Sequence, residues 1–408
     1  MKVVLLGGGG REHALGWKLS QSDRLSTLIS VPGNPGLASL GPVVALDPTD
    51  ATAVVDLVLR ESPDLVVLGP EAPLAAGVVD ALEPTGVPTW GPSRDAAALE
   101  WSKTFAKEIM DKAGVRTAAW ESFTETERAH TYLRSRTSPY VIKANGLAAG
   151  KGVLVTTDLA EAETWVERCL DGEFGERRVV VEDYLEGSEV SVFALCSGEE
   201  AVALEPARDF KRLREGDQGP NTGGMGSFSP VEDLPPGLIE HALDRVIKPV
   251  LKTMANDGKP YTGFLYAGLV LTDSEPTVLE FNCRLGDPET QVLMPRLASD
   301  LIDLIEAGLS GGAAAPEWND LACLNVVLAA PGYPESPEAG ARIDIGDLPD
   351  GALVFHAGTG QDENGIFAQG GRVLNVVGTG SALAEARANA YAAVDAIEFP
   401  DALFRRDI

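Results

Sequence analysis

Positive charge is scarce in this sequence. Its 408 residues include 33 Lys and Arg against 61 Asp and Glu, giving a formal net charge of −28. Because such a field repels the phosphates of nucleic acids, we expect no nucleic-acid partner. It does not exclude a phosphorylated substrate, since a few cations and backbone N–H groups can hold one phosphate. Most of the charge is expected to form a well-solvated surface.

Cysteine and long hydrophobic runs are also scarce. The four cysteines are scattered and form no Cys-x-x-Cys pair. This argues against a disulfide framework and a structural zinc site, and is typical of reduced thiols in a cytoplasm. No run of about 18 apolar residues occurs, so we expect no membrane span. The apolar start is too short for a signal peptide and is followed by glycines, so it indicates the first strand of a folded domain.

The regular feature is an alternation of strand and helix patterns over roughly the first 95 residues. Buried apolar strands separated by helices predict a doubly wound parallel sheet, that is, an α/β N-terminal domain. A helix is predicted from Ser102, a suitable N-cap, to Gly114, a suitable stop. Mixed α+β patterns follow. A low-complexity stretch at 311–319 predicts a linker before a last, β-rich α+β segment with one final helix.

The first strand runs into the glycine-rich stretch "GGGGREHAL". A strand, glycines and then a helix form a common anion-binding geometry, because free N–H groups and the helix dipole point at the ligand. The dinucleotide fingerprint fails at its third glycine, and no acidic residue ends the second strand, so NAD is rejected. Four consecutive glycines favour a ligand over a simple tight turn. The later "VPGNPG" stretch, taken alone, is an ordinary turn.

The stretch "VIKANGLAAGKGVLV" places Lys143 in an apolar strand and Lys151 in a glycine-rich loop. Its glycine spacing is not that of a Walker A loop, and strands rather than a helix follow. Two lysines around such a loop suit a lid that closes over a triphosphate. A surface hairpin with solvated lysines is the alternative. The unpaired charge that Lys143 would bring into an apolar strand argues against it.

Two further stretches are weaker signals by pattern alone. "VVVEDYLEGSEVSV" can offer main-chain groups to an adenine edge and, at Glu189, a carboxylate to a ribose. "ARDFKRLREGDQGPNTGGMG" joins a basic cluster to a loop too rich in glycine for a helix or strand. A disordered surface loop and a site for an anionic acceptor are equally supported there.

The stretch "LEFNCRLGDPETQ" concentrates carboxylates, an amide and a guanidinium, and it has no Ser or His. Glu280 and Asn282 occupy alternate positions, so in a strand both would point to one face, with Phe281 turned into the core. Mg²⁺ prefers oxygen ligands, usually one or two carboxylates plus phosphates.

Taken in order, these motifs resemble the ATP-grasp ligases and, among them, the phosphoribosylamine–glycine ligase family. The matching pieces are "GGGGREHAL", "PGNPG", "GPEAPLAAGVVD", "IKANGLAAGKGV", "GPNTGGMG", "YTGFLYAGL", "EFNCRLGDPETQ" and "VFHAGT". They span nearly the whole chain, and "RLGDPETQ" is highly specific. The chain departs from the usual family pattern at three places. GGGG at 7–10 replaces the more usual GNGG, KAN at 143–145 replaces the usual KAD, and Phe210 stands where a His is common.

The resemblance implies four structural parts. These are an N-terminal domain at 1–101, an ATP-grasp core at 102–119 and 186–318, a mobile lid at 120–185, and a C-terminal domain at 319–408. It also implies ATP as co-substrate, Mg²⁺ or Mn²⁺, and small-molecule substrates only. We expect a monomer in the cytoplasm that acts in purine biosynthesis.

The implied reaction joins glycine to 5-phosphoribosylamine and yields glycinamide ribonucleotide, ADP and phosphate through a glycyl phosphate. Both nucleophiles arrive with the substrates, which explains the missing catalytic nucleophile. The protein then contributes positioning and charge stabilisation. Many ATP-grasp enzymes have a second metal carboxylate on the preceding strand, whereas "YTGFLYAGLVL" has none.

By the same resemblance, each matching residue receives a role. The metal ligands are Glu280 and Asn282, and the catalytic residues are Lys143, Arg284 and Asp287. ATP is expected to contact Lys103, Lys143, Gly146, Lys151, Gly152, Glu182, Asp183, Tyr184, Leu185 and Glu189. The glycine and phosphoribosylamine substrates are expected to contact Gly8, Gly9, Gly10, Pro32, Gly33, Asn34, Asn221, Thr222, Gly223, Gly224, Met225, Arg284, Gly286, Asp287, Pro288 and Glu289.

Two alternatives remain. One is a different ATP-grasp enzyme, such as a carboxylase or a formate-dependent ligase, against which "RLGDPETQ" argues. The other is a non-catalytic nucleotide sensor on the same scaffold. A sensor predicts lost metal or phosphate ligands, yet Lys103, Lys143, Glu280 and Asn282 are all present.

Overall fold

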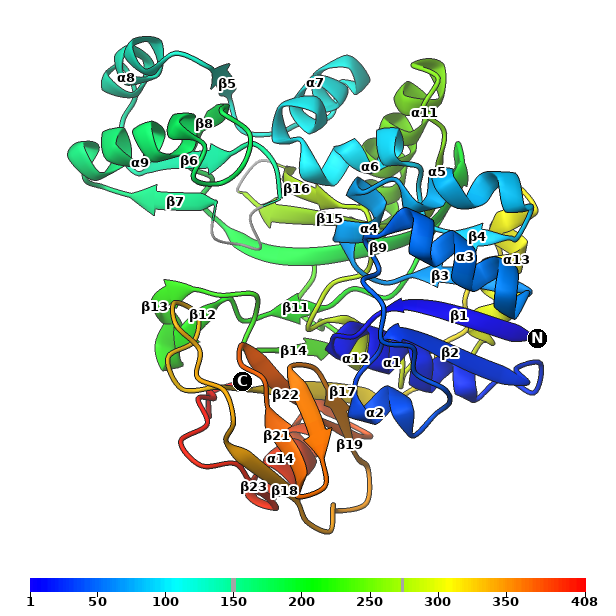
Figure 1. Cartoon of the computed structure of the whole chain (residues 1–408). Coiled ribbons are helices and arrows are strands. Elements are labelled where there is room, and N and C mark those ends of the chain that lie inside the picture. The colour runs from blue at the N-terminus through cyan, green and yellow to red at the C-terminus, as the bar shows by residue number, and fades with distance from the viewer. Residues whose placement is uncertain (148–151, 273–274) are drawn as a thin grey trace.

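The computed structural model describes residues 1–147, 152–272 and 275–408. Figure 1 shows the N-terminal domain on the right, the lid at the upper left and the C-terminal domain below. Lys151, predicted to contact ATP, lies outside the described residues. Within those residues, no helix has the length and apolar character needed to span a bilayer.

The N-terminal domain is the predicted doubly wound sheet, with parallel strands in the order β2–β1–β3–β4. Val4 and Leu6 pack into one hydrophobic core while Val3 and Leu5 pack into another, so both faces of β1 are covered. Its strands are β1 (Lys2–Gly7), β2 (Thr27–Pro32), β3 (Leu65–Leu68) and β4 (Thr89–Trp90). Its helices are α1 (Gly10–Ser20), α2 (Pro35–Ala38), α3 (Ala51–Glu61), α4 (Glu71–Ala75), α5 (Val78–Leu82), η1 (Glu83–Thr85) and α6 (Arg94–Trp101).

Helix α7 (Lys103–Ala113) connects this domain to the lid. The predicted caps are confirmed: the Ser102 hydroxyl accepts the N–H of Phe105 at 3.3 Å, and Gly114 adopts φ +66°. The lid is an antiparallel sheet in the order β5–β8–β6–β7 with two helices. Its elements are β5 (Trp120–Phe123), α8 (Thr126–Arg134), β6 (Tyr140–Ala144), β7 (Val153–Thr156), α9 (Leu159–Asp171) and β8 (Val179–Asp183).

The core sheet is antiparallel, in the order β10–β9–β15–β16. It contains β9 (Ser188–Gly198), β10 (Glu200–Ala203), β15 (Tyr261–Leu271) and β16 (Pro276–Asn282). Phe281 is buried while Glu280 and Asn282 are partly exposed, so the predicted alternation of β16 is confirmed. The accompanying helices are α10 (Leu238–Ala242), the π-helix η3 (Leu243–Ile247), α11 (Lys248–Asn256), α12 (Thr290–Leu293) and α13 (Leu301–Leu309).

A five-stranded sheet, β11–β14–β17–β22–β19, crosses the predicted boundary between core and C-terminal domain. Strands β11 (Arg208–Asp209) and β14 (Gly226–Ser229) come from the core, and β14 pairs with β17 (Ala322–Ala329). Between β11 and β14 lies a hairpin of β12 (Arg212–Arg214), η2 (Glu215–Asp217) and β13 (Gln218–Asn221). The glycine-rich loop that follows it is therefore anchored to the C-terminal domain.

The C-terminal domain is β-rich, as predicted, and packs helix α14 (Leu383–Asp395) on its sheet through Ala386, Ala390 and Val394. The helix ends at Asp395, and Ile397 begins β23. The remaining elements are β18 (Arg342–Ile345), β19 (Ala352–His356), β20 (Thr359–Asp362), β21 (Gly365–Ala368), β22 (Arg372–Gly380) and β23 (Ile397–Glu398).

Candidate active site

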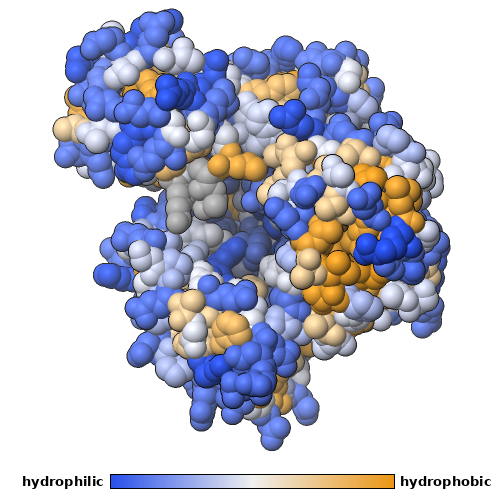
Figure 2. Space-filling model, viewed as in Figure 1, coloured by the Kyte–Doolittle hydropathy of each residue, from blue (hydrophilic) through white to orange (hydrophobic). Residues whose placement is uncertain are grey.

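A cavity of about 420 Å³ is lined by residues from every domain. Figure 2 shows the molecular surface hollowed between the lid, the N-terminal domain and the C-terminal domain. Many of the residues proposed from the sequence line it: Lys103, Lys143, Gly152, Thr222, Gly223, Glu280, Asn282, Arg284, Gly286, Asp287 and Glu289.

The other proposed residues are absent from the described wall of this cavity. They are Gly8, Gly9, Gly10, Pro32, Gly33, Asn34, Gly146, Glu182, Asp183, Tyr184, Leu185, Glu189, Asn221, Gly224, Met225 and Pro288. Several of them still contact residues that line it, and their roles stay predictions.

Lys143 forms a buried ion pair with Glu182 of the neighbouring strand. Strands β6 and β8 pair so that its ammonium meets the Glu182 carboxylate, which also holds Lys107 of α7 at 2.5 Å. All three side chains are at most 5% exposed. Burial raises the pKa of Glu182, but the attraction of Lys143 and Lys107 outweighs it and the net pKa is lowered. Glu182, assigned to an adenine pocket, thus directs its side chain to two buried cations.

The next residues of the proposed adenine segment lead out of the lid. Asp183 donates its N–H to Ala119 at 2.9 Å, and its carboxylate pairs with Arg136. Tyr184 is 48% exposed. Glu189, assigned to a ribose, lies at the start of β9 and pairs with Lys211. A ribose would therefore have to share this carboxylate with a lysine that lines the cavity.

Lys103 lies at the first position of α7 and donates to the carbonyl of Gly146 at 3.1 Å. Burial lowers its pKa, while Glu280 acts in the opposite sense. Lys143 donates to the carbonyl of Leu279 at 3.3 Å, one residue before Glu280. Two cations from separate elements therefore lie beside one carboxylate, as an anionic ligand with a metal ion requires.

Glu280 remains a carboxylate in this setting. Burial raises its pKa, but Lys211, Lys143, Lys103 and Arg284 together bring it below its ordinary value. The Asn282 amide oxygen accepts from Arg284 at 3.2 Å and keeps a second lone pair. One ionised carboxylate and one amide oxygen fit Mg²⁺, provided that phosphate oxygens and water complete its shell.

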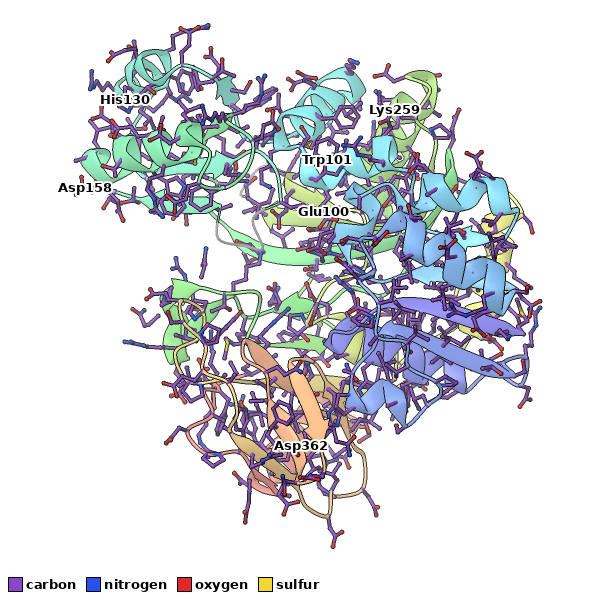
Figure 3. All side chains as sticks on the ribbon, viewed as in Figure 1. Glu100, Trp101, His130, Asp158, Lys259 and Asp362 are labelled. Atoms are coloured by element: carbon purple, nitrogen blue, oxygen red, sulfur yellow. The ribbon has the colours of Figure 1, made fainter. Side chains whose placement is uncertain are left out.

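Arg284 is held by carboxylates of the N-terminal domain. Its guanidinium lies 3.2 Å from Glu71 at the start of α4 and 3.1 Å from Glu100 near the end of α6. Figure 3 labels Glu100, which lies toward the middle of the molecule. Burial raises the pKa of Glu100, whereas Arg284 and Arg11 bring that of Glu71 to about 2 against its burial. Arg284 therefore links the N-terminal domain to the core.

A second group of carboxylates lies beyond Arg284. Glu289 is buried and accepts from Ser191 at 3.2 Å, and Asp209 of β11 lines the same cavity. Burial, reinforced by Asp209, raises the pKa of Glu289 to about 7. Burial likewise raises the pKa of Asp209, against the attraction of Lys211. This end of the cavity can hold a proton or an amine near neutral pH.

Known protein families match the chain over most of its length. Three family models match the chain, all described as domains of phosphoribosylglycinamide synthetase. The N domain matches residues 1–100, the ATP-grasp (A) domain residues 101–290, and the C domain residues 323–408. The chain belongs to this family. Phosphoribosylamine–glycine ligase of Rhizobium meliloti is 47% identical, with 100% of this chain and 98% of that protein covered. The corresponding protein of Allochromatium vinosum is 46% identical over the same shares.

Solved structures place the fold in the same family. The crystal structure of phosphoribosylamine–glycine ligase from Thermotoga maritima has a TM-score of 0.89 at 36% identity and covers both chains completely. A biotin carboxylase from Campylobacter jejuni has a TM-score of 0.76 at 14% identity, covering 99% of this chain and 92% of that one. The second likeness concerns the fold alone. This phosphoribosylglycinamide synthetase family member is an ATP-grasp enzyme that uses ATP.

Phe210, the residue that departs from the family pattern, packs away from the described cavity wall. Its ring lies 6.0 Å from that of Phe228 and beneath the guanidinium of Arg405, whose Cζ is 4.9 Å from the ring centre. Arg405 is buried and pairs with Asp217 and Asp407. In this synthetase the aromatic ring therefore anchors the C-terminal tail to the β12–β13 hairpin.

The first glycine loop has packing reasons for its composition. The Glu12 carboxylate accepts the N–H of Gly9 at 2.7 Å, and a Cβ on Gly7 would lie 2.4 Å from Cγ of Glu12. A Cβ on Gly10 would lie 2.2 Å from the Asn375 amide. Asn34 likewise donates to Gly8 and His356 while capping α2. Close packing therefore explains these glycines, and their number does not by itself indicate a ligand at this loop.

Sequence reasoning missed several residues of the cavity. Glu71 lies in the recognised "GPEAPLAAGVVD" stretch, and Lys107 lies on the predicted helix, so a search for buried charges on predicted helices could have found them. Arg372 and Tyr333 come from the C-terminal domain and lie in no recognised motif. Their sequence contexts contain no comparable signal.

Proposed function

We propose that this chain ligates glycine to 5-phosphoribosylamine, with conversion of ATP to ADP and phosphate. The observation that carries the proposal is the composition of the cavity. Cations and Glu280 line one part, and the turn at 286–289 lines another, while no Ser, Cys or His is found among the described lining residues. Cys283 is buried, and burial raises its pKa well above the ordinary value. Such a site suits substrates that supply their own nucleophiles.

In the first step, a glycine carboxylate oxygen attacks the γ-phosphorus of ATP. A P–O bond to glycine forms and the bond to ADP breaks. Lys103 and Lys143 neutralise the phosphate oxygens. Lys143 becomes available when its ion pair with Glu182 breaks, and Glu182 then stays paired with Lys107. Glu280 and Asn282 would hold Mg²⁺ or Mn²⁺, which supplies charge neutralisation at the phosphates when bound.

In the second step, the amine of 5-phosphoribosylamine attacks the acyl carbon of glycyl phosphate. The C–N bond forms, phosphate leaves, and the amine loses a proton. Arg284 stabilises the departing phosphate charge, and Asp287 orients the amine. The carboxylates of Glu289 and Asp209 lie close enough to the cavity to receive the proton.

The test supplies ATP, glycine and freshly prepared 5-phosphoribosylamine, and measures ADP together with the product mass. We expect ADP release that requires both glycine and the amine. ADP release without glycine would contradict the ligase, and formate- or bicarbonate-dependent release would favour another ATP-grasp enzyme. Bound ATP without any turnover would favour a nucleotide sensor. Sedimentation of the same sample tests the proposed monomer.

A further inference from the structure

Two side chains of the C-terminal domain reach the cavity wall. Arg372 begins β22 and is 18% exposed, and Tyr333 lies in the connection after β17. Both contact the residues 221–225, termed here the NTGGM loop, which belong to the core. Arg372 also contacts residues 286–289, termed the GDPE turn. The C-terminal domain is therefore in direct contact with two segments that line the same part of the cavity.

The guanidinium of Arg372 joins the loop to the turn. Its Nη1 donates to the carbonyl of Gly223 at 2.5 Å and to that of Asp287 at 2.6 Å. Its Nη2 lies 3.2 Å from a carboxylate oxygen of Asp287. The second carboxylate oxygen of Asp287 accepts from Gln291 at 2.8 Å. One side chain thus fixes both the backbone and the carboxylate of the turn.

The peptide groups of Gly223 are held on both sides. Its carbonyl accepts from Arg372, and its N–H donates to the hydroxyl of Tyr333 at 3.0 Å. A glycine-rich loop has many accessible backbone conformations, so such contacts select one of them. Two separate residues of one domain therefore determine where this loop stands.

The fit between loop, turn and Arg372 is close. A Cβ on Gly223 would lie 3.1 Å from Cζ of Arg372, and a Cβ on Gly224 would lie 2.4 Å from Cδ of Pro288. Planar guanidinium groups can donate to several acceptors in fixed directions, whereas a Lys ammonium acts as a point charge. Two carbonyls and a carboxylate contact one guanidinium, and an arginine can donate to all three where a lysine would act as a point charge.

We propose that Arg372, assisted by Tyr333, is a positioning residue that holds the NTGGM loop and the GDPE turn in the arrangement that binds the phosphoribosylamine acceptor. This inference rests on the proposed function, because the family resemblance behind that function assigns the loop and the turn to the glycine and phosphoribosylamine substrates. The ATP-side cations bond elsewhere: Lys103 to Gly146 and Lys143 to Glu182. A positioning role therefore predicts an effect on the acceptor alone.

The experiment measures kcat and the KM of each substrate for wild type, Arg372→Gln, Arg372→Lys and Tyr333→Phe. We expect both Arg372 variants to raise the KM for 5-phosphoribosylamine at least about 10-fold, and Tyr333→Phe about 2- to 10-fold. The KM for ATP should stay within about 2-fold. Arg342→Gln is the matched control, because Arg342 is an exposed arginine of the same domain and pairs with Asp362. Figure 3 labels Asp362 in the C-terminal domain.

Three results would overturn the inference. They are an unchanged KM for the amine in Arg372→Gln, an equal rise in the KM for ATP, and a wild-type KM in Arg372→Lys, which would indicate that charge alone suffices. Tyr333→Phe keeps the test decisive if an Arg372 variant fails to fold, because it removes only one hydroxyl. An inactive wild type would instead overturn the proposed function, so the two failures are distinguishable.

Discussion

The two sides of the cavity are constructed differently. On the side proposed for ATP, charged side chains are buried in direct contact with one another, as Lys107, Glu182 and Lys143 are. On the side proposed for the acceptor, Arg372 of the cavity wall holds two backbone segments, the NTGGM loop and the GDPE turn, through their carbonyls. The first arrangement provides charges for phosphates, and the second provides a shape. Substitutions should therefore affect chemistry and charge balance on one side, and substrate affinity on the other.

The largest expected effect is on the ATP side, at Glu280. Replacement by Gln keeps the shape of the side chain but removes the only ionised metal ligand assigned here. We expect kcat to fall about 10³-fold or more, because charge stabilisation of the phosphates is lost. The measurement is ADP formation at saturating substrates over a range of Mg²⁺ concentrations.

Glu275→Gln is the matched control for that variant. Glu275 precedes the same strand, and its side chain is 61% exposed. Its kcat should equal that of the wild type. A Glu280→Gln enzyme that keeps more than about a tenth of the activity would show that Glu280 is no metal ligand, and the proposed contrast between the two sides would fail.

A second test addresses the buried charges themselves. Glu182→Gln leaves Lys107 and Lys143 without their carboxylate, so we expect a loss of about 3–5 kcal/mol in the free energy of unfolding by urea. Asp244→Asn breaks an exposed pair with Lys248 and should cost at most about 0.5 kcal/mol.

Saturating ATP should recover part of the loss in Glu182→Gln, since its phosphates can pair with the freed lysine. A loss below about 1 kcal/mol would mean that the two ammonium groups are solvated or neutral in the folded chain. The ATP side would then be no more dependent on buried charge than the acceptor side.

The sequence predicted the features that depend on near neighbours. The caps of α7 depend on Ser102 and Gly114, which lie next to the helix, and the alternation at Glu280 and Asn282 depends only on strand geometry. The parallel N-terminal sheet was predictable because buried strands and helices alternate along the chain. In each case the physical cause lies within a few residues of the effect.

Features that depend on distant partners were not predictable in the same way. Gly10 leaves room for the amide of Asn375, more than 300 residues away, and Phe210 turns toward Arg405, nearly 200 residues further along. Arg372 has no special sequence context, because most of its acceptors are backbone carbonyls, which any residue could supply. Spacing along a chain contains no information about such contacts.

On the acceptor side, the stability of the fold should depend on pH through Glu289. The pKa of Glu289 is raised by burial and by Asp209 from 4.5 to about 7. A raised pKa means that the folded state binds the proton more tightly. The resulting stabilisation is complete below about pH 4.5 and is lost as the pH rises through 7. Glu289→Gln should therefore remove a decline on the order of 1–3 kcal/mol between pH 5 and 8.

Urea unfolding at several pH values checks this expectation. Gln keeps an oxygen that can accept from Ser191, so the packing should survive. Glu363→Gln, at an exposed position of the C-terminal domain, should retain the wild-type pH dependence. Parallel curves for Glu289→Gln and the wild type would show that this carboxylate ionises normally.

The smallest effect is expected at Asn145, where the chain has Asn and relatives commonly have Asp. The Asn145 amide nitrogen donates to Glu176 at 2.5 Å, and its oxygen accepts the N–H of Thr104 at 2.9 Å. Asn145→Asp would keep the acceptor, lose the donor and place two carboxylates together. We expect a loss of about 1–2 kcal/mol in unfolding free energy.

The double variant Asn145→Asp with Glu176→Gln should regain that stability, because the Gln amide can donate to the new carboxylate. Urea unfolding of the wild type, both single variants and the double variant gives the coupling directly. Additive losses would mean that the two side chains act independently. Recovery would instead show that the departure from the family at 145 is compensated at 176, and that the ATP side tolerates a new residue when its local charge balance is preserved.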